Sequence, residues 1–92
     1  MDKTQVCIVF ERIEEEDGGV NIDLVAVFPE MVHNGIFSCY SYYEGQHSVC
    51  REEWVIDRTL IATEEQQGRM ISRLASLGYK NIETISKEEL LK

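Results

Sequence analysis

The chain has 92 residues, 43% of them hydrophobic, and a formal net charge of −8 at pH 7. This length fits one domain, so we expect residues 1–92 to form a single unit. The excess of acids repels phosphate backbones and anionic membranes, which argues against nucleic acid and membrane as partners and leaves a basic protein as a compatible one. The simpler explanation of the acids is solubility.

Targeting signals and cysteine usage indicate the compartment. The sequence has no apolar run long enough to span a membrane, and its first ten residues lack the pattern of a signal peptide. The three cysteines are odd in number and are not spaced as a disulfide framework. We therefore expect a cytoplasmic protein with reduced thiols.

Three strands are expected in the first half of the chain. Residues 5–13 are almost continuously apolar, and residues 20–28 alternate before becoming fully apolar, with Pro29 expected to end that strand. Four acids and two glycines between them form a hairpin loop. The third strand covers residues 36–43, and Gly45 breaks it.

The firmest element is a helix over residues 63–77. Thr63 and Gln66 fit a capping box, and an apolar stripe at helical spacing predicts the buried face, namely Met70, Ile71, Leu74 and Leu77. The preceding segment, residues 51–62, is harder to interpret. We expect one helical turn at 51–56 that points Trp54 and Val55 inward.

The remaining elements complete an α+β fold. Residues 80–85 predict a short last strand, and a second capping box at Ser86 begins a short C-terminal helix with Leu90 and Leu91. The expected order is thus β-β-β-α-β plus a short C-terminal helix. Sequential strands favour an antiparallel meander of about four strands, with the main helix packed on one face.

Such a sheet leaves one face without a helix. The first two strands are apolar on both faces, so an uncovered face would expose several hundred Å², which soluble monomers rarely tolerate. The 51–62 segment and the C-terminal tail are two possible covers. If neither suffices, a two-fold homodimer is the commonest solution, and we expect a homodimer.

The segment from Tyr40 to Cys50 is the only one rich in reactive side chains, and it supplies the candidate functional residues Tyr40, Tyr42, Tyr43, Gln46, His47 and Cys50. A histidine near a cysteine can produce a thiolate nucleophile. However, no third residue is assignable to orient this pair. The alternative is structural, with His47 bonded to a backbone group of the Gly45 turn.

Metal and base stacking are weaker alternatives. Structural zinc requires four ligands, and the candidates Cys7, Cys39, His47 and Cys50 contain no Cys-x-x-Cys pair. We expect no metal and no cofactor. Tyr40 and Tyr42 could stack on bases, but no basic stripe accompanies them, so we expect no nucleic acid.

Four separate motifs resemble small uncharacterised proteins of gut anaerobic bacteria and their phages or mobile elements. They are the Gly-Gln-His-Ser turn and the Thr-Glu-Glu-capped helix start, together with Ala26–Glu30 and Leu77–Tyr79 plus Asn81. The chain departs from these relatives at Tyr43, where they often have histidine, and at Ile61, where they have proline. The resemblance implies a shared fold and a mobile-element origin, and it carries no activity.

Two functional hypotheses follow. The first is a small non-enzymatic protein-interaction or regulatory module, one form of which is an acidic decoy for a basic, DNA-binding partner. The second is a small enzyme or ligand-binding protein that uses the Tyr42–Cys50 corner. Because no catalytic motif is complete, we favour the first and expect no catalytic residue.

Overall fold

The computed structural model describes residues 3–92. Over this range the chain is α+β, with a mainly antiparallel sheet and helices packed on it. The elements in chain order are β1 (Thr4–Glu14), β2 (Val20–His33), β3 (Ile36–Ser41), β4 (Gln46–Arg51), α1 (Glu52–Arg58), β5 (Leu60–Ile61), α2 (Glu64–Ser76), β6 (Ile82–Thr84) and α3 (Lys87–Leu90).

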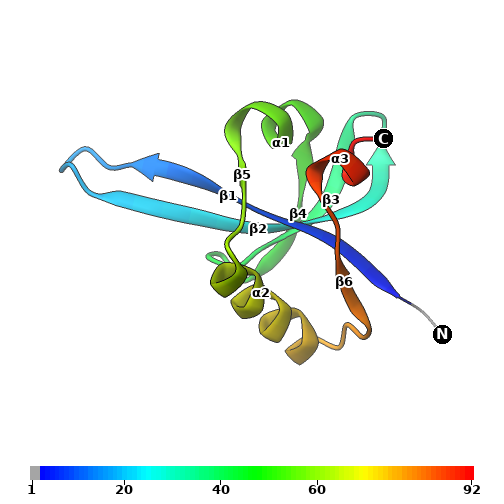
Figure 1. Cartoon of the computed structure of the whole chain (residues 1–92). Coiled ribbons are helices and arrows are strands. Elements are labelled where there is room, and N and C mark those ends of the chain that lie inside the picture. Colours follow the sequence, from blue (N-terminus) through cyan, green and yellow to red (C-terminus); the bar gives the residue numbers. More distant parts are fainter. Residues whose placement is uncertain (1–2) are drawn as a thin grey trace.

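Strand β1 lies at the centre of this arrangement (Figure 1). The strand order is β4-β3-β2-β1-β5, and every pairing along it is antiparallel. Strand β6 pairs with the beginning of β1 in parallel, from Thr4 opposite Ile82 to Val6 opposite Thr84. Strand β1 therefore connects the first hairpin to the two short strands β5 and β6.

The expected α+β class and antiparallel sheet are confirmed, but the sheet has more strands than the four that we expected. Gln46–Arg51 forms a strand that we did not predict, and β5 and the full helix α1 replace the single expected helical turn. Residues 46–49 read Gln-His-Ser-Val, which shows neither alternation nor a run of apolar residues, so the periodicity signal is weak there. The last strand is present, but it pairs in parallel.

Strand β2 does not end at Pro29, as we expected, and continues to His33. Its pairing with β3 shifts register between Val27 and Met31 and again before His33. A bulge leaves residues without a ladder partner, and proline, which has no N–H to donate, is tolerated at such a place.

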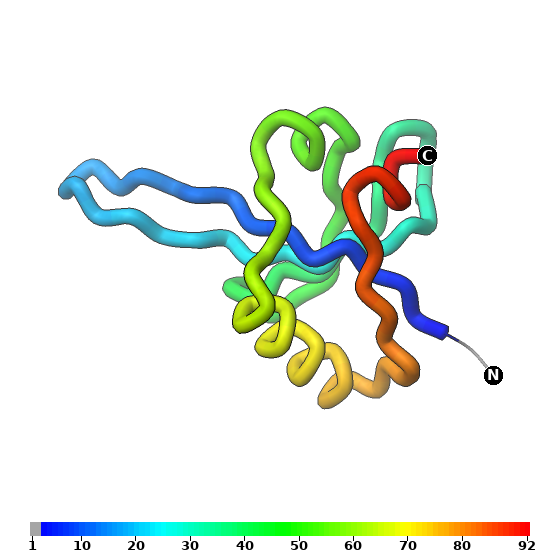
Figure 2. Tube along the Cα trace, viewed as in Figure 1, coloured from blue at the N-terminus to red at the C-terminus, as the bar shows by residue number. Residues whose placement is uncertain are grey.

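Helices cover both faces of the sheet (Figure 2). On one face, here called the α2 face, Met70 and Leu74 pack with β1 to β3 residues and with Ala62. On the other, the α1 face, Val55 of α1 and Leu90 of α3 are buried, with Trp54 and Leu91 packed beside them. The uncovered face that supported the homodimer is thus filled by the two covers named from the sequence. The dimer remains a prediction, now without that area argument.

The predicted helix is confirmed as α2, with both halves of its capping box at Thr63 and Gln66. Its C-terminus is a Schellman motif, in which the N–H of Gly78 bonds Ala75 and the N–H of Tyr79 bonds Leu74. Gly78 has a φ of 105°, which a side chain would strain. Of the four stripe residues, Met70 and Leu74 are buried, Ile71 is half-buried, and Leu77, at 48% exposed, is not in the core.

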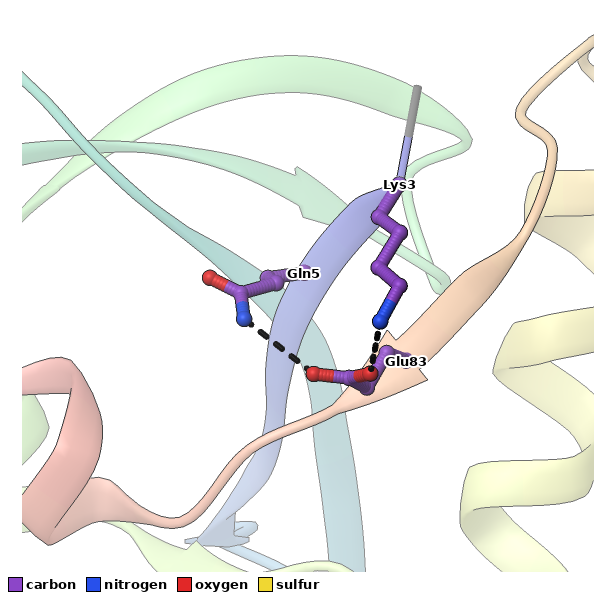
Figure 3. Close-up of polar contacts among 3 residues, drawn as sticks. All are labelled: Lys3, Gln5 and Glu83. Carbon is purple, nitrogen blue, oxygen red and sulfur yellow. Dashed lines mark hydrogen bonds and ion pairs between the residues drawn. The ribbon is translucent and has the colours of Figure 1, made fainter. Parts of the chain in front are cut away.

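Polar contacts accompany the parallel β1–β6 pairing (Figure 3). Gln5 donates a hydrogen bond from Nε2 to Glu83 Oε1 at 3.1 Å, and Lys3 Nζ lies 3.4 Å from the other carboxylate oxygen. The Gln5 bond and then the Lys3 charge lower the pKa of Glu83. These groups are exposed, so they align the strands more than they stabilise them.

No helix within residues 3–92 is long and apolar enough to cross a membrane.

Leu74→Ala should destabilise the fold by about 2–4 kcal/mol, because it leaves a cavity on the α2 face where Leu74 is fully buried. Leu77→Ala is the matched control and should change the free energy of unfolding by less than about 0.5 kcal/mol. Urea unfolding followed by circular dichroism measures both. Equal losses from the two variants would contradict this packing of α2.

Candidate functional site

The Tyr40–Cys50 segment forms two strands and a turn, so its candidate residues separate onto opposite faces. In the β3–β4 register, Tyr40 lies opposite His47 and Phe37 lies opposite Cys50. Tyr40 belongs to the α2 face and Phe37 to the α1 face. Because successive strand residues alternate, His47 and Cys50 point to opposite sides of the sheet. The cysteine–histidine pair considered from the sequence is therefore not assembled.

On the α2 face an aromatic cluster surrounds His47. Its Nε2 lies 2.7 Å from the hydroxyl of Tyr79, and its ring meets the edge of Tyr40 at 5.0 Å between centroids. Tyr79 in turn stacks on Phe28 at 5.4 Å. The partner of His47 is thus a phenol beyond α2, not a backbone group of the Gly45 turn. This contact ties β4 to the helix C-terminus.

Arg73 of α2 occupies the tyrosines that we considered for base stacking. Its guanidinium carbon lies 4.5 Å from the centroid of the Tyr42 ring, and its Nη1 lies 3.4 Å from the Tyr40 hydroxyl. Tyr40 is buried and Tyr42 is half-buried. Tyr40 and Tyr42 therefore serve the packing of β3 and the following turn against α2.

The α1 face contains an open groove of about 380 Å³ beside β4. Its apolar part combines floor residues Val25, Cys39 and Cys50 with Trp54 at the side, and its polar part holds Ser41, Ser48, Asp23 and Glu44, with Val49 and Arg51 also lining it. An apolar lining with a few polar groups is typical of ligand and peptide sites. Of the six candidate residues, only Cys50 lines this groove.

Trp54 is held in position by a short polar chain on α1 and β1. Its indole Nε1 donates to Glu11 Oε1 at 3.3 Å, and Arg58 Nε lies 3.4 Å from the other oxygen of Glu11. The indole is half-buried and packs on the core of the α1 face. Trp54 is thus both a core contact and an oriented side of the groove.

Asp23 is the perturbed carboxylate of the groove. Burial raises its pKa first, and the nearby charges of Glu11 and Glu44 raise it further. Ser41 Oγ, 3.5 Å away, opposes the shift weakly. A carboxylate in this position is short of positive charge, so a cation in the groove would relieve it.

The thiols are not activated for nucleophilic chemistry. Burial raises the pKa of Cys7 to about 11. The hydrogen bond that Cys50 donates to the sulfur of Cys39, followed by burial, raises the pKa of Cys50. The same bond lowers the pKa of Cys39, and burial opposes that shift. Cys39 itself is only 5% exposed. Among residues 3–92, no three His, Cys, Asp or Glu side chains converge as a metal site.

Sequence reasoning did not anticipate the first hairpin as a functional element. Residues 11–23, here called the arm, extend beyond the rest of the sheet (Figures 1 and 2). The pairings of β1 with β5 and of β2 with β3 stop at Phe10 and Val25, so no third strand flanks the arm. It exposes three large apolar side chains, Ile13 (42%), Val20 (50%) and Ile22 (45%).

Tyr43 connects the candidate corner to the arm. It is 77% exposed, and it lines a small hollow with Ile13, Ile22, Glu15 and Asn21, together with Asp23 and Glu44. Gln46 is also exposed and donates to Glu44 at 3.1 Å. An exposed tyrosine beside isoleucines and carboxylates is suited to contact with a protein. The sequence does contain a sign of this surface, namely apolar residues of the first hairpin directly beside its acidic loop.

Comparison of the chain with protein-family models, with curated proteins and with solved structures finds no match.

Iodoacetamide should modify Cys50 slowly at pH 7.5 in the native protein, because its pKa is raised by its bond to Cys39 and by burial. After unfolding in urea, all three thiols should react at the rate of a free cysteine. Peptide mass spectrometry of timed samples measures this. Fast, selective labelling of Cys50 in the folded state would instead revive the enzyme hypothesis.

Asp23→Asn should stabilise the fold at neutral pH, because the raised pKa of Asp23 means that its charged form is disfavoured in the native state. Below the ordinary carboxylate pKa of about 4, Asp23 is neutral in both states and the advantage should disappear. Urea unfolding of both proteins between acid and neutral pH measures the difference. A variant that is less stable than wild type at neutral pH would contradict the assigned shift.

Proposed function

We propose that this protein is a non-enzymatic protein-interaction module whose main contact surface is the acidic arm together with Tyr43. The observation that supports this proposal is the exposure of Ile13, Val20 and Ile22 on a hairpin outside the shared core. An isolated two-stranded hairpin is marginally stable in water. Extending one with exposed isoleucines costs stability unless a partner covers it.

Charge indicates the kind of partner. The arm holds six acids and one arginine, so more than half of the chain's net charge of −8 lies in these thirteen residues. Apolar side chains rimmed by carboxylates match a protein surface that combines apolar contacts with lysine or arginine. Complementary charge speeds encounter and selects the partner, while the apolar residues hold the contact.

A basic, DNA-binding protein is one partner of this chemistry, and the module would then act as an acidic decoy. A regulatory role and a mobile-element origin fit the same surface. Self-association through the arm is less favoured, because two arms would bring together two net charges of −5. The predicted homodimer of this 10.6 kDa chain would therefore have to pair through another surface.

The second hypothesis is an enzyme or ligand-binding protein at the Tyr42–Cys50 corner, and its enzyme form has no activated nucleophile there. His47 and Cys50 lie on opposite faces, and the pKa of Cys50 is raised. The groove could still bind a ligand, because its lining does not require His47 and Cys50 to form a pair.

Neutralising the tip of the arm should abolish binding to a basic partner without affecting the fold. We would measure fluorescence anisotropy of a labelled arginine–leucine peptide at about 50 and about 300 mM NaCl, where screening differs strongly. The variant E14Q/E15Q/E16Q/D17N should lose most binding at low salt. All four residues are exposed, so their substitution should leave the unfolding midpoint nearly unchanged.

The control E30Q/E53Q/E64Q/E88Q removes the same number of exposed acids from outside the arm. It should retain binding. Equal weakening by the two variants would show that net charge alone acts and would contradict the arm as the contact surface. Ile22→Ser tests the apolar part and should weaken binding at both salt concentrations.

A further inference from the structure

Strand β4 is an unprotected edge of the sheet. It pairs only with β3, and no described residue pairs with its other side. Edge strands are normally protected by proline, lysine, a bulge or a covering element. Residues 46–51 contain no proline, lysine or bulge, and the charged side chain of Arg51 lies at the last position of the strand. The register with β3 is regular from Ile36 to Ser41.

The hydrogen-bond pattern shows which backbone groups are open. The N–H of Glu52 bonds the carbonyl of Gly35, which makes that pair a hydrogen-bonded one. In an antiparallel ladder such pairs alternate, so Gln46, Ser48 and Cys50 bond to β3. The N–H and C=O groups of His47, Val49 and Arg51 therefore point outward, away from the sheet.

The groove on the α1 face lies directly beside this edge. Ser48 and Cys50 of β4 line it, and so does Trp54, which follows in α1. A strand added to β4 would place alternate side chains into the groove, opposite Ser48 and Cys50. The added strand would thus be held by backbone bonds and selected by its groove-facing side chains, as in other strand-addition complexes.

Charge defines the occupant. The two carboxylates Asp23 and Glu44 lie toward the turn end of the groove, and burial together with the charges of Glu11 and Glu44 raises the pKa of Asp23. Arg51 follows Cys50 at the other end of β4. Asp23 lies on β2, so a strand added beside β4 would be three spacings of about 4.8 Å away from it. A long basic side chain on the added strand would therefore contact Glu44 and extend toward Asp23.

We infer that β4 and this groove bind an extended peptide segment of a partner protein, with an apolar side chain against Cys50 and Trp54 and a lysine or arginine two residues away toward Glu44 and Asp23. This site goes beyond the arm, because Asp23 is the one arm residue in its lining and the acidic tip at residues 14–17 is not part of it. The peptide adds one strand to the sheet beside β4.

A second copy of this chain fits the same edge poorly. Antiparallel pairing of β4 with itself keeps the two faces aligned only when it is centred on a residue, such as Ser48 or Val49. A pairing centred on Ser48 places Glu52 of the second copy opposite Glu44, and this contact between like charges is repulsive. A pairing centred on Val49 places Glu52 opposite Gln46, whose amide already bonds Glu44.

The test uses a synthetic peptide of about eight residues with valine and lysine at alternate positions on one face and threonine elsewhere. Nitrogen-15 spectra of the full-length protein would follow it. The amides of His47, Val49 and Arg51 should shift and become protected from exchange. Emission of Trp54, the one tryptophan in the chain, should change with the same saturation curve.

Val49→Pro removes one outward N–H without removing a bond to β3, and an outward position on an edge strand tolerates proline. It should weaken binding by at least about tenfold, as expected from losing a backbone bond and its register. Val49→Thr keeps the N–H and should bind as wild type does. If Val49→Pro fails to fold, a peptide methylated at its own backbone nitrogens gives the same test with wild-type protein.

Glu44→Gln should reduce the preference for lysine over glutamine in the peptide, while E14Q/E15Q/E16Q/D17N should leave the groove response in place. The response of E14Q/E15Q/E16Q/D17N therefore tests the groove independently of the arm, so that failure of one proposal can be told from failure of the other. Three outcomes would overturn the inference: equal binding of the methylated peptide, peptide shifts centred on residues 14–17, or β4 shifts that follow protein concentration without peptide, which would indicate a second copy.

Discussion

The burial of β1 on both faces is the constraint on which the rest of the structure depends. Val6, Cys7, Ile8 and Val9 are each at most 1% exposed, although neighbours in a strand point to opposite sides. Two separate cores are therefore required, and one helix cannot supply both. The chain meets this requirement by crossing the sheet edges, so that α2 covers one face and α1 with α3 the other. The short strands β5 and β6 pair with β1 between these helices.

The same constraint explains where the surface becomes available for function. Glu11 still contacts Trp54 and Arg58 of α1, and Asp23 still contacts Ser41. Farther out, no third strand within residues 3–92 pairs with the hairpin, and its side chains are exposed and mostly acidic. Strand β4 ends the strand order, and no residue within 3–92 pairs with its outer backbone groups. Both proposed contacts are thus parts of the sheet that the two cores do not cover. Neither requires catalytic chemistry, which agrees with the raised pKa values of Cys7 and Cys50 and with the burial of Cys39.

Local signals in the sequence predicted what local physics determines. The cap at Thr63, the stop at Gly78 and the apolar run of residues 6–9 each act within a few residues, and each is present in the structure. Strand β4 was missed because Gln46 to Val49 owe their strand to pairing with β3, not to their own pattern. The site was only partly predictable for the same reason. His47 contacts Tyr79, which lies 32 residues away in the sequence. Whether His47 shares a face with Cys50 depends on strand β4, which the sequence pattern does not predict.

A doubly covered core thus supports a hairpin whose outer part, residues 13–21, lies outside both hydrophobic clusters. Amide hydrogen exchange of the free protein tests this directly, because slow amides report global unfolding and fast ones report local opening. The account predicts that the amides of Val6 to Val9 exchange slowest of all, and that those of residues 13–21 exchange orders of magnitude faster. Arm amides as well protected as those of β1 would contradict it, because the arm would then be part of the stable fold and not a surface awaiting a partner.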